Sequence, residues 1–153
     1  MSLKCEILFK DKIICIKGRI DETFRETTKV IPLFGEISFN LKDLISINSG
    51  GIREWVILMN KMKAASISLY ECPKTLIDQV NMVKDFIPAN AKVMSFYVPF
   101  YNEKNATEKN VLFVYNQDYT RDKVLPLKKV LDEKGDEMEI DVSEAKYFKF
   151  IKG

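Results

Sequence analysis

The sequence predicts an α/β fold, in which helices cover a mixed β-sheet, with a small β-rich appendage at the C-terminal end. Between residues 4 and 98, short β-rich runs alternate with two segments of helical apolar periodicity. After Pro99 the pattern changes to polar, turn-like sequence with only short apolar runs. A chain of 153 residues with 46% hydrophobic residues has the size and composition of a globular domain with a small addition.

The first third of the chain is predicted to form strands and their connections. Residues 4–10 and 13–20 are β-rich runs separated by two polar residues, which predicts a hairpin. Residues 21–28 are polar and are predicted to form a loop or an irregular turn. Residues 29–34 are apolar, fit neither helix nor strand clearly, and end at a glycine. Residues 37–41 alternate apolar and polar side chains, which predicts a half-buried strand.

The first long helix is predicted to begin after Asn48 and Ser49. Side-chain oxygens of these two residue types accept hydrogen bonds from the free N–H groups of a first helical turn. Apolar residues then recur at a spacing of three to four, as on one face of a helix. This predicted face consists of Ile52, Trp55, Val56, Met59 and Met62.

A strand, a second helix and another strand complete the predicted α/β unit. Residues 67–70 read as a short buried strand. Pro73 suits the first position of a helix, because that position needs no N–H donor. The apolar face of this helix is predicted to contain Leu76, Val80 and Val83. Residues 93–98 are predicted to form the last strand, ended by Pro99.

The appendage is predicted to contain little regular structure. Residues 101–110 are turn-like, and residues 111–115 read as a strand. A charged stretch with a turn at Gly135 leads to a short alternating strand at residues 138–142. Ser143 is predicted to cap a last helix. The sequence therefore predicts a division into residues 1–99 and residues 100–153.

Composition excludes several classes of site. The chain contains no histidine, which excludes Ser-His-Asp and Cys-His catalysis and every metal site that needs imidazole. The formal net charge of +2 gives no electrostatic reason to expect a nucleic acid or an anionic membrane as partner. No pair of carboxylates or activated thiol stands out. We therefore expect no catalytic residues, no metal and no cofactor.

Cysteine use and apolar run length predict a cytoplasmic location. Cys5, Cys15 and Cys72 form no close pair in the sequence and are predicted to be reduced, with a Cys5–Cys15 pair as the alternative. No apolar run follows a basic start, as a signal peptide would require. The longest apolar run, residues 55–59, is far shorter than the roughly 20 residues of a membrane span.

The region around the first long helix resembles the STAS domain, the fold of anti-sigma factor antagonists. Asn40-Leu41 stands where that family has Asp-Leu, and residues 48–52 (Asn-Ser-Gly-Gly-Ile) stand where it has Asp-Ser-Ser-Gly-Leu. The resemblance covers residues 4–98 and includes Cys72-Pro73 at the start of the second helix. Gly50 occupies the position of the serine that the partner kinase phosphorylates in the family. Because glycine has no hydroxyl, that modification is impossible here.

This resemblance implies a bacterial, non-catalytic module that binds a protein partner. The partner would be an anti-sigma kinase-like protein, a transporter ATPase or another signalling protein. Two consecutive glycines would let the partner's backbone approach closely, and the start of the helix would favour an acidic group. The predicted partner-binding residues are Ser46, Asn48, Ser49, Gly50, Gly51 and Arg53. The alternative is a nucleotide- or nucleic-acid-binding protein that uses the Gly-Gly helix start and the appendage.

The appendage resembles the zinc ribbon that follows the last core strand in some bacterial STAS-like proteins. The four positions that would carry cysteine ligands are Asn102, Asn105, Leu131 and Lys134. Structural zinc requires thiolate or imidazole ligands, so no metal is expected. The resemblance implies a ribbon-shaped unit held by packing alone, through Phe100, Tyr101, Phe113, Tyr147 and Phe148.

Overall fold

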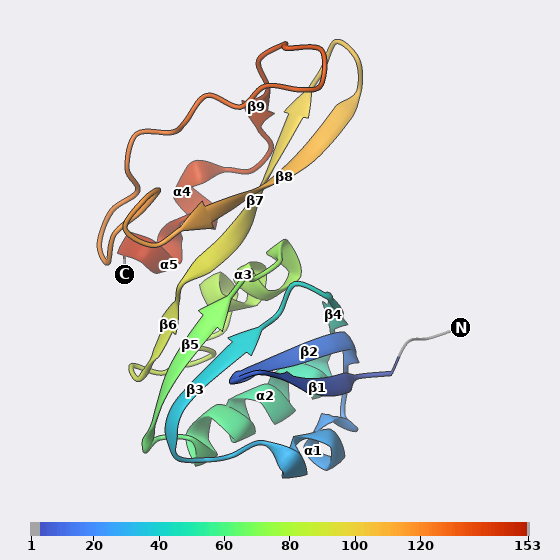
Figure 1. Cartoon of the computed structure of the whole chain (residues 1–153), viewed down its shortest axis with the longest axis vertical. Helices are drawn as coiled ribbons and strands as arrows, with labels where there is room; N and C mark the ends of the chain where they lie inside the picture. The colour runs from blue at the N-terminus through green and yellow to red at the C-terminus, as the bar shows by residue number, and fades with distance from the viewer. Residues whose placement is uncertain (1–3, 153) are drawn as a thin grey trace.

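The computed structural model describes residues 4–152, which form a main unit of residues 4–94 and a C-terminal unit of residues 95–152 (Figure 1). The main sheet has the order β1-β2-β3-β5-β6, and β4 pairs with the end of β2. A second sheet has the order β8-β7-β9. The fold is therefore mixed α/β, as the sequence predicts.

The main sheet combines one antiparallel pair with parallel pairs. Its strands are β1 (Glu6–Lys10), β2 (Ile13–Ile20), β3 (Gly35–Asn40), β4 (Leu44–Ile47), β5 (Ala65–Tyr70) and β6 (Ala91–Val93). The predicted hairpin is confirmed, because β1 and β2 are antiparallel with Lys10 opposite Ile13. The other pairings are parallel. Each parallel pairing needs a crossover, which the helices supply.

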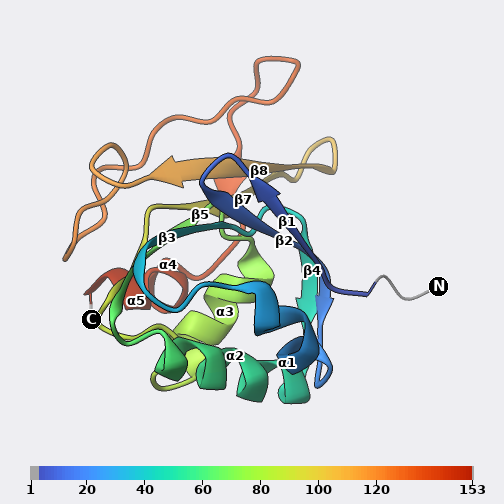
Figure 2. The same cartoon turned by 60° about the horizontal axis from the view of Figure 1, so that its bottom comes forward.

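The helices of the main unit lie on one face of the sheet (Figure 2). They are α1 (Phe24–Thr27), followed by a single 3-10 turn (Thr28–Val30), then α2 (Ser49–Lys61) and α3 (Lys74–Met82). Trp55 of α2 is fully buried under the sheet, and its ring lies 5.4 Å from that of Phe86. Its indole Nε1 donates to the carbonyl oxygen of Phe86 at 2.9 Å, so the buried polar atom is satisfied.

Two predictions for the main unit need correction, and one strand was not predicted. Residues 21–28 were predicted to be a loop or an irregular turn, but only residues 21–23 are; α1 begins at Phe24, whose ring is buried and lies 6.4 Å from that of Trp55. Strand β4 was not predicted, since only two of its four residues are buried and the pattern is too short to read. The strand predicted at residues 93–98 is two strands, β6 in the main sheet and β7 in the second.

The C-terminal unit is built on the hairpin of β7 (Ser95–Asn102) and β8 (Thr107–Val114). Pro99 lies inside β7 and does not end it, so the division predicted after Pro99 falls within a strand. Proline is tolerated here because Pro99 takes part through its carbonyl oxygen, which accepts from the Asp141 N–H at 2.8 Å. The short strand β9 (Glu139–Ile140) pairs with the other side of β7.

An aromatic cluster centred on Phe96 forms the core of this unit. Five aromatic rings lie within 6.1 Å of the Phe96 ring, between centroids: Phe113, Tyr119, Tyr147, Phe148 and Phe150. Four of the five side chains predicted to hold the unit are buried, namely Phe100, Phe113, Tyr147 and Phe148. Tyr101 is only half-buried. Packing therefore accounts for most of the cohesion of the unit.

Two short helices end the chain and attach it to the main unit. They are α4 (Glu144–Tyr147) and α5 (Lys149–Lys152), where the sequence predicted one helix capped by Ser143. Ser143 stands at the N-cap but its side chain makes no capping hydrogen bond. Asn81 of α3 donates to the carbonyl oxygen of Tyr147 and accepts from the N–H of Phe150, both at 2.9 Å.

Candidate functional site

The predicted partner-binding residues lie at the start of α2. Asn48 is the N-cap, as predicted, and its Oδ1 accepts from the Gly51 N–H at 2.8 Å. Ser49 is the first residue of the helix, and its hydroxyl is not the capping group. Asn48, Ser49 and Arg53 are exposed, Ser46 and Gly50 are half-buried, and Gly51 is buried.

The two glycines face other parts of the protein, Gly51 a backbone carbonyl group and Gly50 chiefly a side chain. A Cβ at Gly51 would lie 2.6 Å from the carbonyl carbon of Ile20, so this glycine allows α2 to start against the end of β2. A Cβ at Gly50 would lie 3.1 Å from the side chain of Glu22. Gly51 is thus a packing position and is not part of the exposed surface that a partner could touch.

The charges around the helix start differ from those that the sequence suggested. The loop that places Glu22 beside Gly50 brings a carboxylate to the positive end of α2. Arg19 donates to the Ser46 hydroxyl at 3.0 Å. Arg53 forms no ion pair with any residue in the described part of the chain. The helix start therefore already holds one acid, and Arg53 is its uncompensated cation.

Large apolar side chains lie next to these residues. Ile57 is 37% exposed and lies one helical turn after Arg53 on the outer face of α2. Ile45 of β4 is 43% exposed. Sequence analysis did not single out either residue. Ile57 could have been found, because it is a large apolar residue that lies outside the predicted apolar face of the helix. We call Asn48, Ser49, Arg53 and Ile57 the α2 surface.

Comparisons with protein-family models, with curated proteins and with solved structures found no match to this chain.

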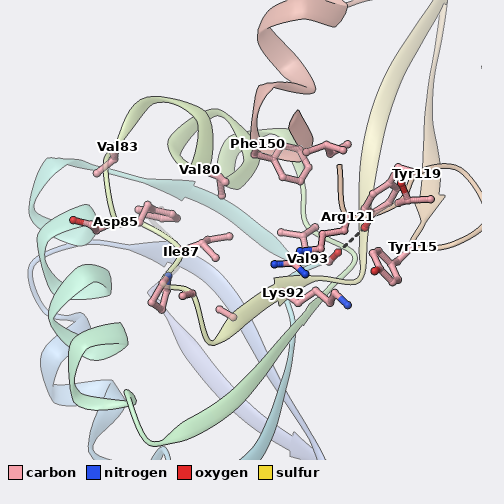
Figure 3. A pocket seen from close by; sticks show the side chains of 16 residues that line it. Val80, Val83, Asp85, Ile87, Lys92, Val93, Tyr115, Tyr119, Arg121 and Phe150 are labelled. Carbon is pink, nitrogen blue, oxygen red and sulfur yellow. Dashed lines mark hydrogen bonds between the residues drawn. The ribbon is translucent and has the colours of Figure 1, made fainter. Parts of the chain in front are cut away.

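A cavity of about 520 Å³ lies between α3, β6, the loop after β8 and α5 (Figure 3). Its apolar walls include Val80, Ile87, Val93 and Phe150, and two cations, Lys92 and Arg121, reach it from the main and C-terminal units. Its volume falls inside the range of roughly 300–1,000 Å³ that is typical of ligand pockets. Sequence analysis missed this site, because its walls come from segments up to about seventy residues apart.

At the far tip of the C-terminal unit, Asp132 joins its own turn to the turn between β7 and β8. Its Oδ2 accepts from the side-chain amides of Asn102 and Asn105, at 2.9 Å each. Its Oδ1 accepts from the backbone N–H groups of Lys134 and Asp136, also at 2.9 Å. These bonds, with that of Asn105 first, hold the pKa of the Asp132 carboxyl at about 2, because each stabilises the ionised form.

Asn102 and Asn105 are two of the four positions that the sequence analysis compared with cysteine ligands, and their side chains meet at Asp132. Leu131 and Lys134, the other two positions, contribute no side-chain hydrogen bond to it. Within residues 4–152 no group of three or more Cys, Asp or Glu side chains is arranged to hold a metal ion. Asp132 was not predicted to hold these loops together. The one signal in the sequence is its position in an Asp-x-x-Gly pattern, which is typical of a turn.

A second polar cluster lies where β3 and β5 end. Glu71 has a positive φ of 50° and accepts from the Asn40 amide at 2.6 Å and from the Tyr97 hydroxyl at 2.8 Å. The Asn40 bond, with that of Tyr97, lowers the pKa of Glu71. Burial and the neighbouring Glu71 raise the pKa of Tyr97 to about 12. The groups satisfy one another, so this cluster joins β3, β5 and β7 and offers no open site.

The cysteines show no sign of activation or pairing. All three are free, and Leu8, not Cys5, lies opposite Cys15. Burial raises the pKa of the Cys5 thiol to about 11 and raises that of Cys72 further. Cys5 and Cys72 are therefore poor nucleophiles at neutral pH. No helix in residues 4–152 has the length and apolarity needed to cross a bilayer.

Proposed function

We propose that this chain is a STAS-like, non-catalytic regulatory module of the bacterial cytoplasm that binds a protein partner through the α2 surface. The observation that carries the proposal is the exposed stripe of Ser49, Arg53 and Ile57 along one face of α2. A cation without a partner and a large apolar side chain one turn away are both groups that an interface can bury.

The arrangement of the main unit supports the family part of this proposal. An antiparallel hairpin leads into parallel strands, and α2 and α3 cover the same face of the sheet. The position of the regulatory serine is Gly50, the second residue of α2, and it lies beside Glu22. A kinase switch at that position is impossible, so we expect the fraction of bound protein to be set by partner concentration or by another signal. A kinase-like protein or a transporter ATPase fits the resemblance as partner.

The nucleotide-binding alternative gains nothing from the geometry of the helix start. The Gly51 N–H is already bonded to Asn48, and the Glu22 carboxylate lies beside Gly50, where a phosphate would have to sit. Like charges at such a distance repel. We therefore do not propose it as a second function.

Site-specific photocrosslinking in cells tests the proposal. A photoreactive amino acid at Ile57 is expected to capture one main protein species, because Ile57 would lie in the interface. The matched control is Met82, which is 75% exposed at the end of α3, away from the α2 surface. Arg53→Glu should abolish the capture from position 57. Equal capture of the same species from both positions, or no effect of Arg53→Glu, would contradict the proposal.

A further inference from the structure

We propose that the cavity between α3, β6 and α5 binds a small molecule that combines one anionic group with an apolar, aromatic-sized body. Neither the resemblance nor the proposed function assigns a ligand to this place. The cavity is defined by side chains of both units, so it exists only when the C-terminal unit is packed on the main unit (Figure 3).

The charges around the cavity favour an anion. Lys92 holds its ammonium group 4.0 Å from the centre of the Tyr115 ring. Arg121 extends into the cavity in Figure 3, and neither cation forms an ion pair within residues 4–152. Asp85 is the one acid of the lining, and its carboxylate points away from the cavity. Both are exposed residues of the lining, and two such cations without an ion pair form a site for a carboxylate, sulfonate or phosphate group.

The remaining lining favours an apolar body attached to that anion. Five apolar side chains line the cavity: Val80, Val83, Ile87, Val93 and Phe150. The hydroxyl of Tyr119 is not available to a ligand, because it donates to the Val93 carbonyl oxygen at 2.6 Å. A free inorganic anion would leave these apolar walls in contact with water. An aromatic or branched body would displace that water, which is favourable.

Calorimetric titration with 1-naphthoate and its neutral analogue 1-naphthamide tests this site. We expect naphthoate to bind once per chain and naphthamide to bind at least about tenfold more weakly, because only the first pairs with the cations. Arg121→Gln should remove most of that difference, and Lys63→Gln, which changes an exposed lysine that does not line the cavity, should leave it unchanged. Ala89→Trp, placed in the cavity wall, should block both compounds.

Absence of saturable binding by naphthoate would overturn the proposal. So would equal affinities of the two compounds for the unmodified protein, or affinities that Arg121→Gln and Ala89→Trp leave unchanged.

A second inference rests on a different feature, the edge strand β1. We infer that β1 pairs antiparallel with β1 of a second copy of this chain. In the described chain β1 has β2 on one side only. Leu8 is 53% exposed and Phe9 is 57% exposed, and no proline or bulge protects the edge.

The sequence of β1 is self-complementary in charge. Pairing two copies about a two-fold axis at Leu8 would place Glu6 opposite Lys10 of the second copy, and the reverse. Ile7 would then lie opposite Phe9. Opposite charges and apolar cross-strand pairs both stabilise an antiparallel ladder. A second copy therefore fits this edge better than an unrelated strand whose charges are not matched.

Sedimentation analysis of charge-swap variants tests this pairing. Unmodified protein should dimerise as its concentration rises. Glu6→Lys and Lys10→Glu should each weaken the dimer by about tenfold, because each places like charges opposite one another. The double variant, and an equimolar mixture of the two single variants, should regain it. Glu6 and Lys10 are both exposed, so the fold should persist in these variants. A monomer at all concentrations, or a double variant as weak as the single ones, would overturn the inference.

Discussion

The main unit and the C-terminal unit both bury aromatic side chains completely, but they position these side chains by different means. Trp55 projects from α2 and packs against Phe24 of α1 and Phe39 of β3, and its third aromatic neighbour, Phe86, lies in the loop after α3. Phe96 is surrounded by rings from a hairpin, an irregular loop and two four-residue helices. Regular backbone bonds set the geometry in the first case. In the second, side chains must supply most of it, including the polar contacts of Asp132.

Trp55→Ala should cause the largest loss of stability. Removing a fully buried indole ring costs about 3–5 kcal/mol, and the Phe86 carbonyl oxygen loses its donor. Urea unfolding followed by far-UV circular dichroism measures the change. Trp55→Phe, which keeps most of the volume, is the control and should lose less. A change below about 1 kcal/mol for Trp55→Ala would mean that the main unit does not depend on this core.

Phe96→Ala should be somewhat less costly and more local. We expect a loss of about 3–4 kcal/mol, since the surrounding irregular backbone can partly close the cavity. Trp55 is the only tryptophan, so its fluorescence reports the main unit alone. In native buffer the emission of Trp55 should stay that of a buried indole, while amide exchange in residues 95–152 should accelerate. Exposure of Trp55 in this variant would show that the two units fold as one.

The regular part of the main unit was largely predictable from the sequence, and the reasons are physical. The hairpin, α2 and β5 each carry an apolar period long enough to identify the buried face. Strand β4 and helix α1 are four residues each, and Phe24 is a single apolar anchor in a polar stretch. Such short elements form because the tertiary structure buries one or two side chains, which no local pattern records.

The candidate sites followed the same rule. The cap at Asn48 was predictable because capping depends on neighbouring residues. Three other features were not predictable, because each joins segments that are distant in the chain. They are the contact of Gly50 with Glu22, the cavity around Arg121 and the bonds of Asp132. Four aromatic core residues of the C-terminal unit were predicted, but Tyr119 was not, and Phe96 was not recognised as the centre of the cluster.

Gly51→Ala tests how closely the regular elements of the main unit approach each other. The added methyl group would overlap the Ile20 carbonyl group, so α2 would have to shift, at a cost of about 1–3 kcal/mol. Gly50→Ala is the matched control. It meets mainly the side chain of Glu22, which can move, and should cost less than about 1 kcal/mol. Thermal unfolding of both variants measures the two losses of stability. Equal losses in Gly51→Ala and Gly50→Ala would contradict the packing role of Gly51.

Asp132→Asn should give the smallest effect on global stability and a clear local one. Asparagine can accept fewer hydrogen bonds at this position, so the amides of Lys134 and Asp136 should exchange faster. The pKa of Asp132 is lowered from 3.8 to about 2 in the folded protein. Its stabilising contribution is therefore complete above pH 4 and is lost as the pH falls through 2. Nuclear magnetic resonance of these amides should follow that titration in the unmodified protein, and slow exchange that persists in Asp132→Asn would contradict the role.

The carboxylate of Asp132 has one consequence that reaches beyond stability. The hydrogen bonds that join these loops use only amide, carboxylate and peptide groups, all of which belong to the chain itself. None of the groups in these bonds is a thiol, so an oxidant that attacks cysteine would leave the bonds themselves unchanged.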